Sequence, residues 1–198
     1  MPYLPAKPDL VQLRNQAKDL LRNANHGDAN ALARIQAVSD RLILSSAQLA
    51  VAREYGFESW PKLKREVERR ETLNSRDLGR LSALLAENPD LAVSPMVNWT
   101  DHRLGANPLN YVAMIGFDHE RLGLPESPTG TGAVAKALID AGAPIDGLPG
   151  DSETPLMTAA SYGDIEVARV LVECGAELEA RVRRCRRHPR RHSADARR

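Results

Sequence analysis

Three residues near the carboxyl end of the chain have side chains and a spacing that could bind a metal ion. Cys185, His188 and His192 form a C-x2-H-x3-H pattern, and Cys174 lies upstream as a possible fourth ligand. Thiolate and imidazole groups are the ligands that Zn²⁺ prefers in proteins. The spacing is poor, because Cys174 falls within a predicted helix and the segment around Pro189 is rich in arginine, which repels a dication. We therefore predict no metal site.

A second pattern that could do chemistry is a glycine-rich loop. Gly130, Gly132 and Ala135 give G-x-G-x-x-A directly before a predicted helix, where backbone N–H groups can bind phosphate. The nucleotide-binding form of this loop follows a strand, and the preceding PESPT is not one. His119 and Glu120 form an adjacent acid–base pair, but they belong to no pattern that includes a nucleophile. We therefore predict a non-enzymatic protein with no cofactor.

A third candidate is the basic helix that follows a helix and a short turn within residues 46–71. Such a helix-turn-helix-like element could enter the major groove of DNA. Glutamates alternate with the basic residues, however, and pairs such as Lys62–Glu66 and Glu66–Arg70 are typical of a solvated helix. We therefore expect no nucleic-acid partner, and a DNA-binding regulator is the alternative function. Its contacts would be Lys62, Lys64, Arg65, Arg69 and Arg70.

The elements that would position these residues begin with a helical leader, residues 1–75. Four short helices are predicted there, because each of four apolar stripes follows a residue that can cap a helix. The capping residues are Asp9, Asp28, Ser45 and Ser59.

Residues 153–178 contain two further helices joined by a tight turn. Thr154 can cap the first helix, Pro155 suits its first position, and Gly163 suits the left-handed conformation that ends it. Gly175 closes the second helix. Two short helices with small apolar residues bury too little surface alone, so they must stack on a copy of themselves.

That copy lies upstream in the sequence. Residues 106–116, ANPLNYVAMIG, overlay 153–163, ETPLMTAASYG, and residues 134–145 overlay 167–178. The glycines that close the two copies lie 33 residues apart. A period of 33 with T-P-L, a mid-repeat glycine and a closing G-A resembles the ankyrin repeat.

The resemblance implies an all-α fold, an ankyrin-repeat helical solenoid preceded by a small N-terminal helical region. About three repeats would occupy residues 76–180. Residues 77–92 look like the later half of a degenerate first repeat, and the second repeat carries an insertion at 117–133. Residues 44–64 resemble a leader segment found ahead of ankyrin repeats in bacterial proteins.

Two features concern contacts between the repeats. Ala113 and Ala160 should allow the neighbouring helix to approach closely, so that Ala160→Leu would overpack the contact. The position that carries histidine in most ankyrin repeats holds Asn110 and Met157. We therefore expect weak or absent side-chain hydrogen bonds between the repeats there.

The charge of the chain is segregated, although its formal sum is only +1. Residues 1–75 carry +3, residues 76–180 carry −10, and residues 181–198 carry +8. An acidic repeat region favours a basic partner and repels nucleic acid and anionic lipid. The sequence has no 18-residue apolar run and no secretory leader. We expect a cytoplasmic monomer without a membrane partner.

The tail, residues 181–198, is half arginine and lacks apolar periodicity, so we expect it to be disordered. It stands where a repeat array would have another repeat or a polar cap. It could be a native basic arm, or the product of a frameshift or truncation of a longer array; we favour the second interpretation.

The resemblance also implies a function and a site. Ankyrin repeats bind other proteins through their extended turns and the exposed end of the first helix. The apolar residues there require a cover, from either the insertion or a partner. Carried over to this chain, the protein-binding positions are Ala106, Met114, Ile115, Glu153, Ser161 and Tyr162.

Overall fold

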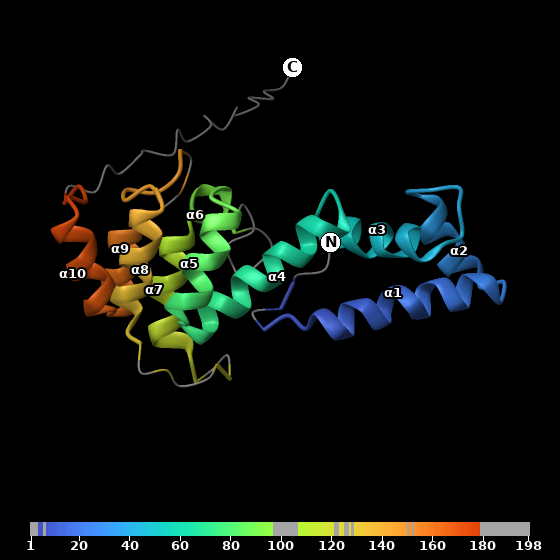
Figure 1. Cartoon of the computed structure of the whole chain (residues 1–198), viewed down its shortest axis with the longest axis horizontal. Helices are drawn as coiled ribbons and strands as arrows, with labels where there is room; N and C mark the ends of the chain where they lie inside the picture. Colours follow the sequence, from blue (N-terminus) through green and yellow to red (C-terminus); the bar gives the residue numbers. More distant parts are fainter. Residues whose placement is uncertain are drawn as a thin grey trace, which may run out of the picture.

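The computed structural model describes residues 4–5, 7–96, 107–120, 123–124, 127, 129–149, 151 and 153–178. These residues form ten α-helices and no strand, which confirms the all-α fold. Figure 1 shows an elongated molecule with the first three helices at one end and the last two at the other. No helix within these ranges is long and apolar enough to span a membrane.

The first four helices are α1 (Leu10–Asn25), α2 (Ala29–Gln36), α3 (Leu44–Glu54) and α4 (Trp60–Ser75). Three begin as their capping residues predict. The Asp9 carboxylate accepts hydrogen bonds from two N–H groups of the first turn of α1. Asp28 and Ser59 each accept one at the start of α2 and α4. The cap predicted at Ser45 is wrong, because the N-cap of α3 is Ile43, two residues earlier, and it has no side-chain cap.

The leader helices surround their own hydrophobic core. Leu13, Ala17 and Leu20 on one face of α1 pack with buried residues of α2 and α3. The helix α4 completes this core with Leu63 and Val67, both fully buried. The core is rich in alanine and leucine, because helices with small side chains can approach closely.

The remaining helices form the second part of the molecule. They are α5 (Leu78–Glu87), α6 (Asp90–Val93), α7 (Pro108–Asp118), α8 (Thr131–Asp140), α9 (Pro155–Tyr162) and α10 (Ile165–Glu173). The pair α7–α8 stacks on the pair α9–α10, with α7 against α9 and α8 against α10 (Figure 1). On its other side α8 contacts α5. These helices share a second hydrophobic core.

The long helix α4 belongs to both cores. Its Leu63 and Val67 lie in the leader core, whereas Leu73 lies in the repeat core. The hydroxyl of Tyr111 in α7 donates to Asn74 Oδ1 in α4, at 2.6 Å. Burial raises the pKa of Tyr111 to about 12. The boundary proposed after residue 75 therefore falls at the end of α4, a helix that packs in both the leader core and the repeat core.

A buried ion cluster on α4 was not predicted. Glu66, Arg69 and Arg70 are 4%, 3% and 0% exposed. Glu66 Oε1 accepts from Arg70 Nε at 2.9 Å, and Glu66 Oε2 accepts from Arg69 Nε at 2.9 Å. The predicted Glu66–Arg70 pair is thus present, but the solvated surroundings expected for it are wrong, as is the Lys62–Glu66 pair. Lys62 instead pairs with Glu58.

The two arginines of this cluster also bind backbone carbonyls far away in the sequence. Arg69 donates to carbonyl oxygens within residues 91–95, at 2.9 to 3.2 Å. Arg70 donates to those of Leu4 and Pro5, at 3.1 and 3.2 Å. Buried charges are tolerated only when they are paired and hydrogen-bonded, and these contacts meet that condition. The cluster therefore fixes the N-terminal segment and the end of α6 onto α4.

Side-chain hydrogen bonds do connect the two repeats, contrary to expectation. Asn110 Nδ2 donates to Thr158 Oγ1 at 2.8 Å and to the Glu153 carbonyl at 3.3 Å. Thr131 Oγ1 donates to Asp164 Oδ1 at 3.0 Å. The amide of Asn110 replaces the expected histidine as a donor, because Thr158 of the next repeat lies within its reach.

The close approach of repeats predicted at two alanines occurs at one. Ala113 is fully buried, whereas Ala160 is exposed, so the contact predicted for Ala160 is wrong. The neighbouring Ala159 is the buried alanine of α9. Ala160 is thus not packed between helices among the described residues.

Candidate protein-binding surface

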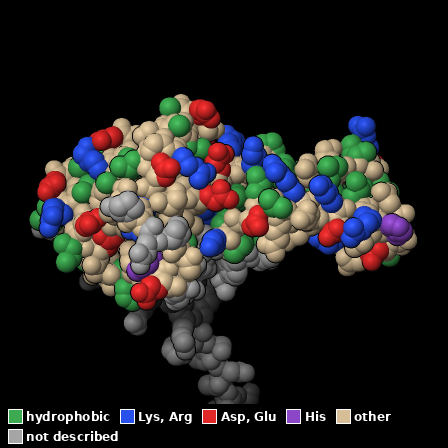
Figure 2. Space-filling model, turned by 60° about the horizontal axis from the view of Figure 1, so that its bottom comes forward, with side chains coloured by type: hydrophobic (Ala, Val, Ile, Leu, Met, Phe, Trp, Pro, Cys, Tyr) green, Lys and Arg blue, Asp and Glu red, His purple; other side chains and the backbone are tan. Residues whose placement is uncertain are grey.

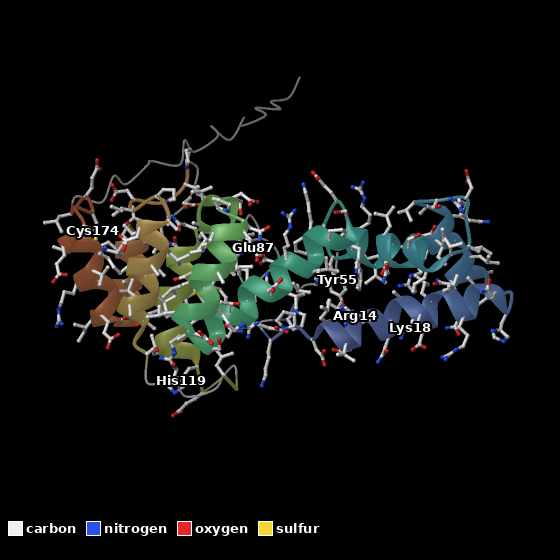
Figure 3. All side chains as sticks on the ribbon, in the orientation of Figure 1. Arg14, Lys18, Tyr55, Glu87, His119 and Cys174 are labelled. Carbon is white, nitrogen blue, oxygen red and sulfur yellow. The ribbon has the colours of Figure 1, made fainter. Side chains whose placement is uncertain are left out.

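The residues considered for metal binding or catalysis do not form a site within the described ranges. Cys185, His188 and His192 lie outside these ranges. Cys174 is half-buried at the C-terminal end of α10, and Figure 3 places it on the opposite side of the repeat region from His119. No group of three metal-ligating side chains is present among the described residues.

The glycine-rich loop before α8 is occupied by a side chain of this chain. The N–H of Gly132 donates to Glu166 Oε2 at 3.2 Å. A Cβ atom at Gly130 would overlap the Glu166 carboxylate, and one at Gly132 would lie 3.1 Å from the Glu166 carbonyl oxygen. The glycines thus make room for the next repeat, and Glu166 supplies the negative charge that the N-terminus of a helix attracts.

Two of the five basic residues proposed to contact DNA are unavailable. Arg69 and Arg70 are buried in the ion cluster and hold backbone carbonyls. Arg65 donates to Asn88 Oδ1 at 3.3 Å. On the face that Figure 2 shows, basic and acidic side chains are interspersed. DNA binding through the full set of predicted contacts is therefore incompatible with this arrangement.

A small cavity lies where α4 meets α6. Its volume is about 190 Å³, and it is lined by Phe57, Arg65, Leu91 and the buried pair Glu66–Arg69, among others. Binding sites for small molecules usually occupy about 300–1,000 Å³. The buried charges that line this cavity already bind one another and backbone carbonyls. We therefore assign no ligand to it.

The structure does not gather the six predicted protein-binding residues into one patch. Ala106 lies outside the described residues. Met114 and Ile115 are 4% and 1% exposed, because they pack in the repeat core. They are therefore covered within the chain, and they offer no accessible side chain to a partner.

The three other predicted residues are at least partly accessible. Glu153 is half-buried before α9, where its Oε2 accepts from Thr158 Oγ1 at 3.3 Å. Ser161 is exposed and Tyr162 is half-buried at the opposite end of α9. Only Ser161 and Tyr162 are thus neighbours on one surface.

A second aromatic side chain, that of Phe117, lies against Tyr162 and is exposed. Phe117, in the last turn of α7, is 66% exposed, and its ring lies against that of Tyr162. The ring centroids are 5.7 Å apart and the planes are tilted by 59°. Tilted pairs at this distance are favourable for aromatic rings. We call Phe117, Ser161 and Tyr162 the aromatic surface.

The sequence overlay missed Phe117 because α7 is longer than its counterpart. Gly163 ends α9 with φ of 71°, but the equivalent Gly116 lies within α7, which continues to Asp118. A Cβ atom at Gly116 would lie 2.7 Å from Asp164 Oδ2, so this glycine provides room for a side chain of the next repeat. The segment predicted as an insertion, 117–133, therefore begins inside α7 and ends inside α8.

Comparison with known proteins agrees with this architecture. Residues 133–172, which include α9 and most of α8 and α10, match the family model described as ankyrin repeats (many copies). The chain matches no curated protein, and it matches no solved structure. The match and the stacking of the helix pairs show that residues 133–172 form ankyrin repeats. Ankyrin repeats are generally modules of protein–protein interaction, and their family is typically non-enzymatic.

Proposed function

We propose that this chain binds a protein partner, without catalysing a reaction, through the aromatic surface. The observation that carries the proposal is the exposure of Phe117, two thirds of whose side chain is in contact with solvent at the end of an ankyrin-repeat helix. Covering apolar area contributes about 25 cal/mol per Å². The contact with Tyr162 restricts the Phe117 ring beforehand, which lowers the entropy lost on binding.

The charge around this surface suggests the chemistry of the partner. Glu120 is exposed one turn beyond Phe117, and residues 76–180 carry a net charge of −10. Interfaces commonly have an apolar centre and a polar rim. We therefore propose a partner with an apolar contact residue surrounded by basic side chains, met in the cytoplasm.

Replacement of Phe117 by alanine tests this proposal. Proteins that bind the wild type are first captured from the source cells, and the affinity of each purified candidate is then measured by calorimetry. We expect Phe117→Ala to raise the dissociation constant about tenfold or more, and Tyr162→Ala to raise it to a smaller degree.

The matched control is Val11→Ala, which removes an apolar side chain that is 60% exposed on α1. It should leave the affinity unchanged, and all three variants should keep the far-UV circular dichroism of the wild type. A partner that binds Phe117→Ala as tightly as the wild type would refute the proposed site.

A further inference from the structure

The last helix pair has an apolar outer face that no described residue covers. Ile165 and Val172 of α10 are 71% and 48% exposed, Met157 of α9 is 38% exposed, and Leu178 is 75% exposed. Figure 1 places α10 at the end of the molecule opposite the leader. We define the end face as Met157, Ala160, Ile165, Ala168, Val172 and Leu178.

The preceding repeat shows what such a face accepts. The residues of α7 and α8 that overlay the end face include Asn110, Ala113, Gly132 and Ala135, and all four are buried. The structure that covers them is the helix pair α9–α10. In the preceding repeat, the face at these positions therefore binds another pair of α-helices.

The residues that follow in the sequence do not have the composition of such a cover. Residues 181–198 contain nine arginines and no periodic apolar side chains. An arginine-rich segment gains little from an apolar face, because its charged groups must stay hydrated. The end face is therefore open to a second molecule.

The edge of the end face carries one basic and one acidic side chain, which can pair with the same two side chains of another copy. Arg169 and Glu173 are both exposed on α10, one turn apart beside the stripe of Ile165, Ala168 and Val172. Neither forms an ion pair with a described residue. If two α10 helices cross antiparallel about a two-fold axis midway between these residues, each arginine meets the glutamate of the other copy. A two-fold interface requires this self-complementarity.

We propose that the end face binds a second copy of this chain in a two-fold symmetric dimer with α10 antiparallel to α10. The end face shares no residue with the aromatic surface, so the dimer does not depend on the function proposed above. It departs from the monomer expected from the sequence. Six residues are fewer than the roughly 20 of a standard interface, so we expect a dissociation constant in the micromolar range.

Sedimentation equilibrium of the full chain, from about 1 to 300 µM, tests the dimer. We expect the wild type to pass from monomer to dimer over this range and Ile165→Glu to stay monomeric. Ile165 is mostly exposed, so this variant should keep its fold, as checked by circular dichroism. The control Val11→Glu, at a similarly exposed apolar position of the leader, should associate like the wild type.

A charge exchange tests the two-fold arrangement itself. Arg169→Glu should weaken association about tenfold, and the double variant Arg169→Glu/Glu173→Arg should restore it, because the two signs are exchanged in both copies. A wild type that is monomeric throughout, or a dimer that persists in Ile165→Glu, would overturn the proposal. A double variant that associates as weakly as the single variant would also overturn it. So would an Ile165→Glu variant that fails to bind a different protein but whose self-association is unchanged.

Discussion

The two helix pairs α7–α8 and α9–α10 have the same sequence pattern but different surroundings. Ala113 is fully buried and the equivalent Ala160 is exposed; Asn110 is 3% exposed and the equivalent Met157 is 38% exposed. The start of the first helix and the closing glycine, Gly142 or Gly175, are set locally in both copies. Burial is set by the neighbour, because the first pair has helices on both sides whereas the second has them on one. The repeat pattern alone thus does not determine which of its residues form a core.

The largest difference in stability is expected between removing a buried glutamate on the covered side of the repeats and an exposed one at the uncovered end. Glu66 of α4 neutralises Arg69 and Arg70, so Glu66→Ala leaves two buried cations without their counter-ion. We expect the free energy of unfolding to fall by about 3–5 kcal/mol. The matched variant at the free end, Glu173→Ala, should change it by less than about 0.5 kcal/mol when both variants are made in an Ile165→Glu background, which prevents the proposed dimer from contributing. Urea unfolding measures both, and equal effects would show that the cluster is not the buried link described above.

Ionisation of the buried Tyr111 should lower the stability of the folded chain at high pH. Its pKa is about 12 in the folded chain, mainly because of burial, against about 10 when unfolded. The folded state therefore holds this proton more tightly, so the stabilisation is complete below pH 10 and is lost as the pH rises toward 12. The loss is on the order of 2–3 kcal/mol. Unfolding measured from pH 9 to 12 should show this fall, and Tyr111→Phe should lack it; the same slope in both proteins would contradict the assignment.

Leucine at equivalent positions tests the difference in burial directly. Ala113→Leu should overpack the contact between α7 and its neighbours and lower the free energy of unfolding by about 1–3 kcal/mol. Ala160→Leu should change it by less than about 0.5 kcal/mol, because this position is exposed. Both variants are compared by urea midpoints in an Ile165→Glu background, which prevents the proposed dimer from contributing. Similar midpoints for the two would mean that a neighbour covers both repeats.

The hydrogen bond between the repeats gives a smaller effect. Asn110→Ala removes the donor to Thr158 and should lower the free energy of unfolding by about 0.5–1.5 kcal/mol. In the Ile165→Glu background, which prevents the proposed dimer, Met157→Ala at the equivalent exposed position should be nearly neutral. Thermal unfolding can measure this difference, and a neutral Asn110→Ala would indicate that the bond adds nothing to stacking.

The parts of the fold that the sequence predicts are those decided by neighbours along the chain. Asp9, Asp28, Ser59 and Thr154 cap helices as expected, because a cap needs only its own side chain and the next turn. The repeat overlay also located α7 to α10, since helix spacing and the T-P-L signal are local.

The remaining features depend on residues far apart in the sequence. Arg69 can be buried because carbonyls from residues 91–95 accept its hydrogen bonds. Gly116 lies within a helix and leaves room for the side chain of Asp164 in the next repeat. For the same reason, the sequence predicted Ser161 and Tyr162 of the aromatic surface but not Phe117. Tyr162 follows from the repeat overlay, but Phe117 becomes a surface residue only because α7 continues past Gly116.

Amide hydrogen exchange followed by mass spectrometry compares the two repeats most directly. In the Ile165→Glu variant, peptides from α8 and α10 are measured in the same molecule and under the same conditions. We expect the amides of α10 to exchange at least about tenfold faster than those of α8, because a helix with one uncovered side opens at a lower free energy. Equal protection of α8 and α10 would contradict the conclusion that the covering neighbour, rather than the repeat pattern, determines the stability of each repeat.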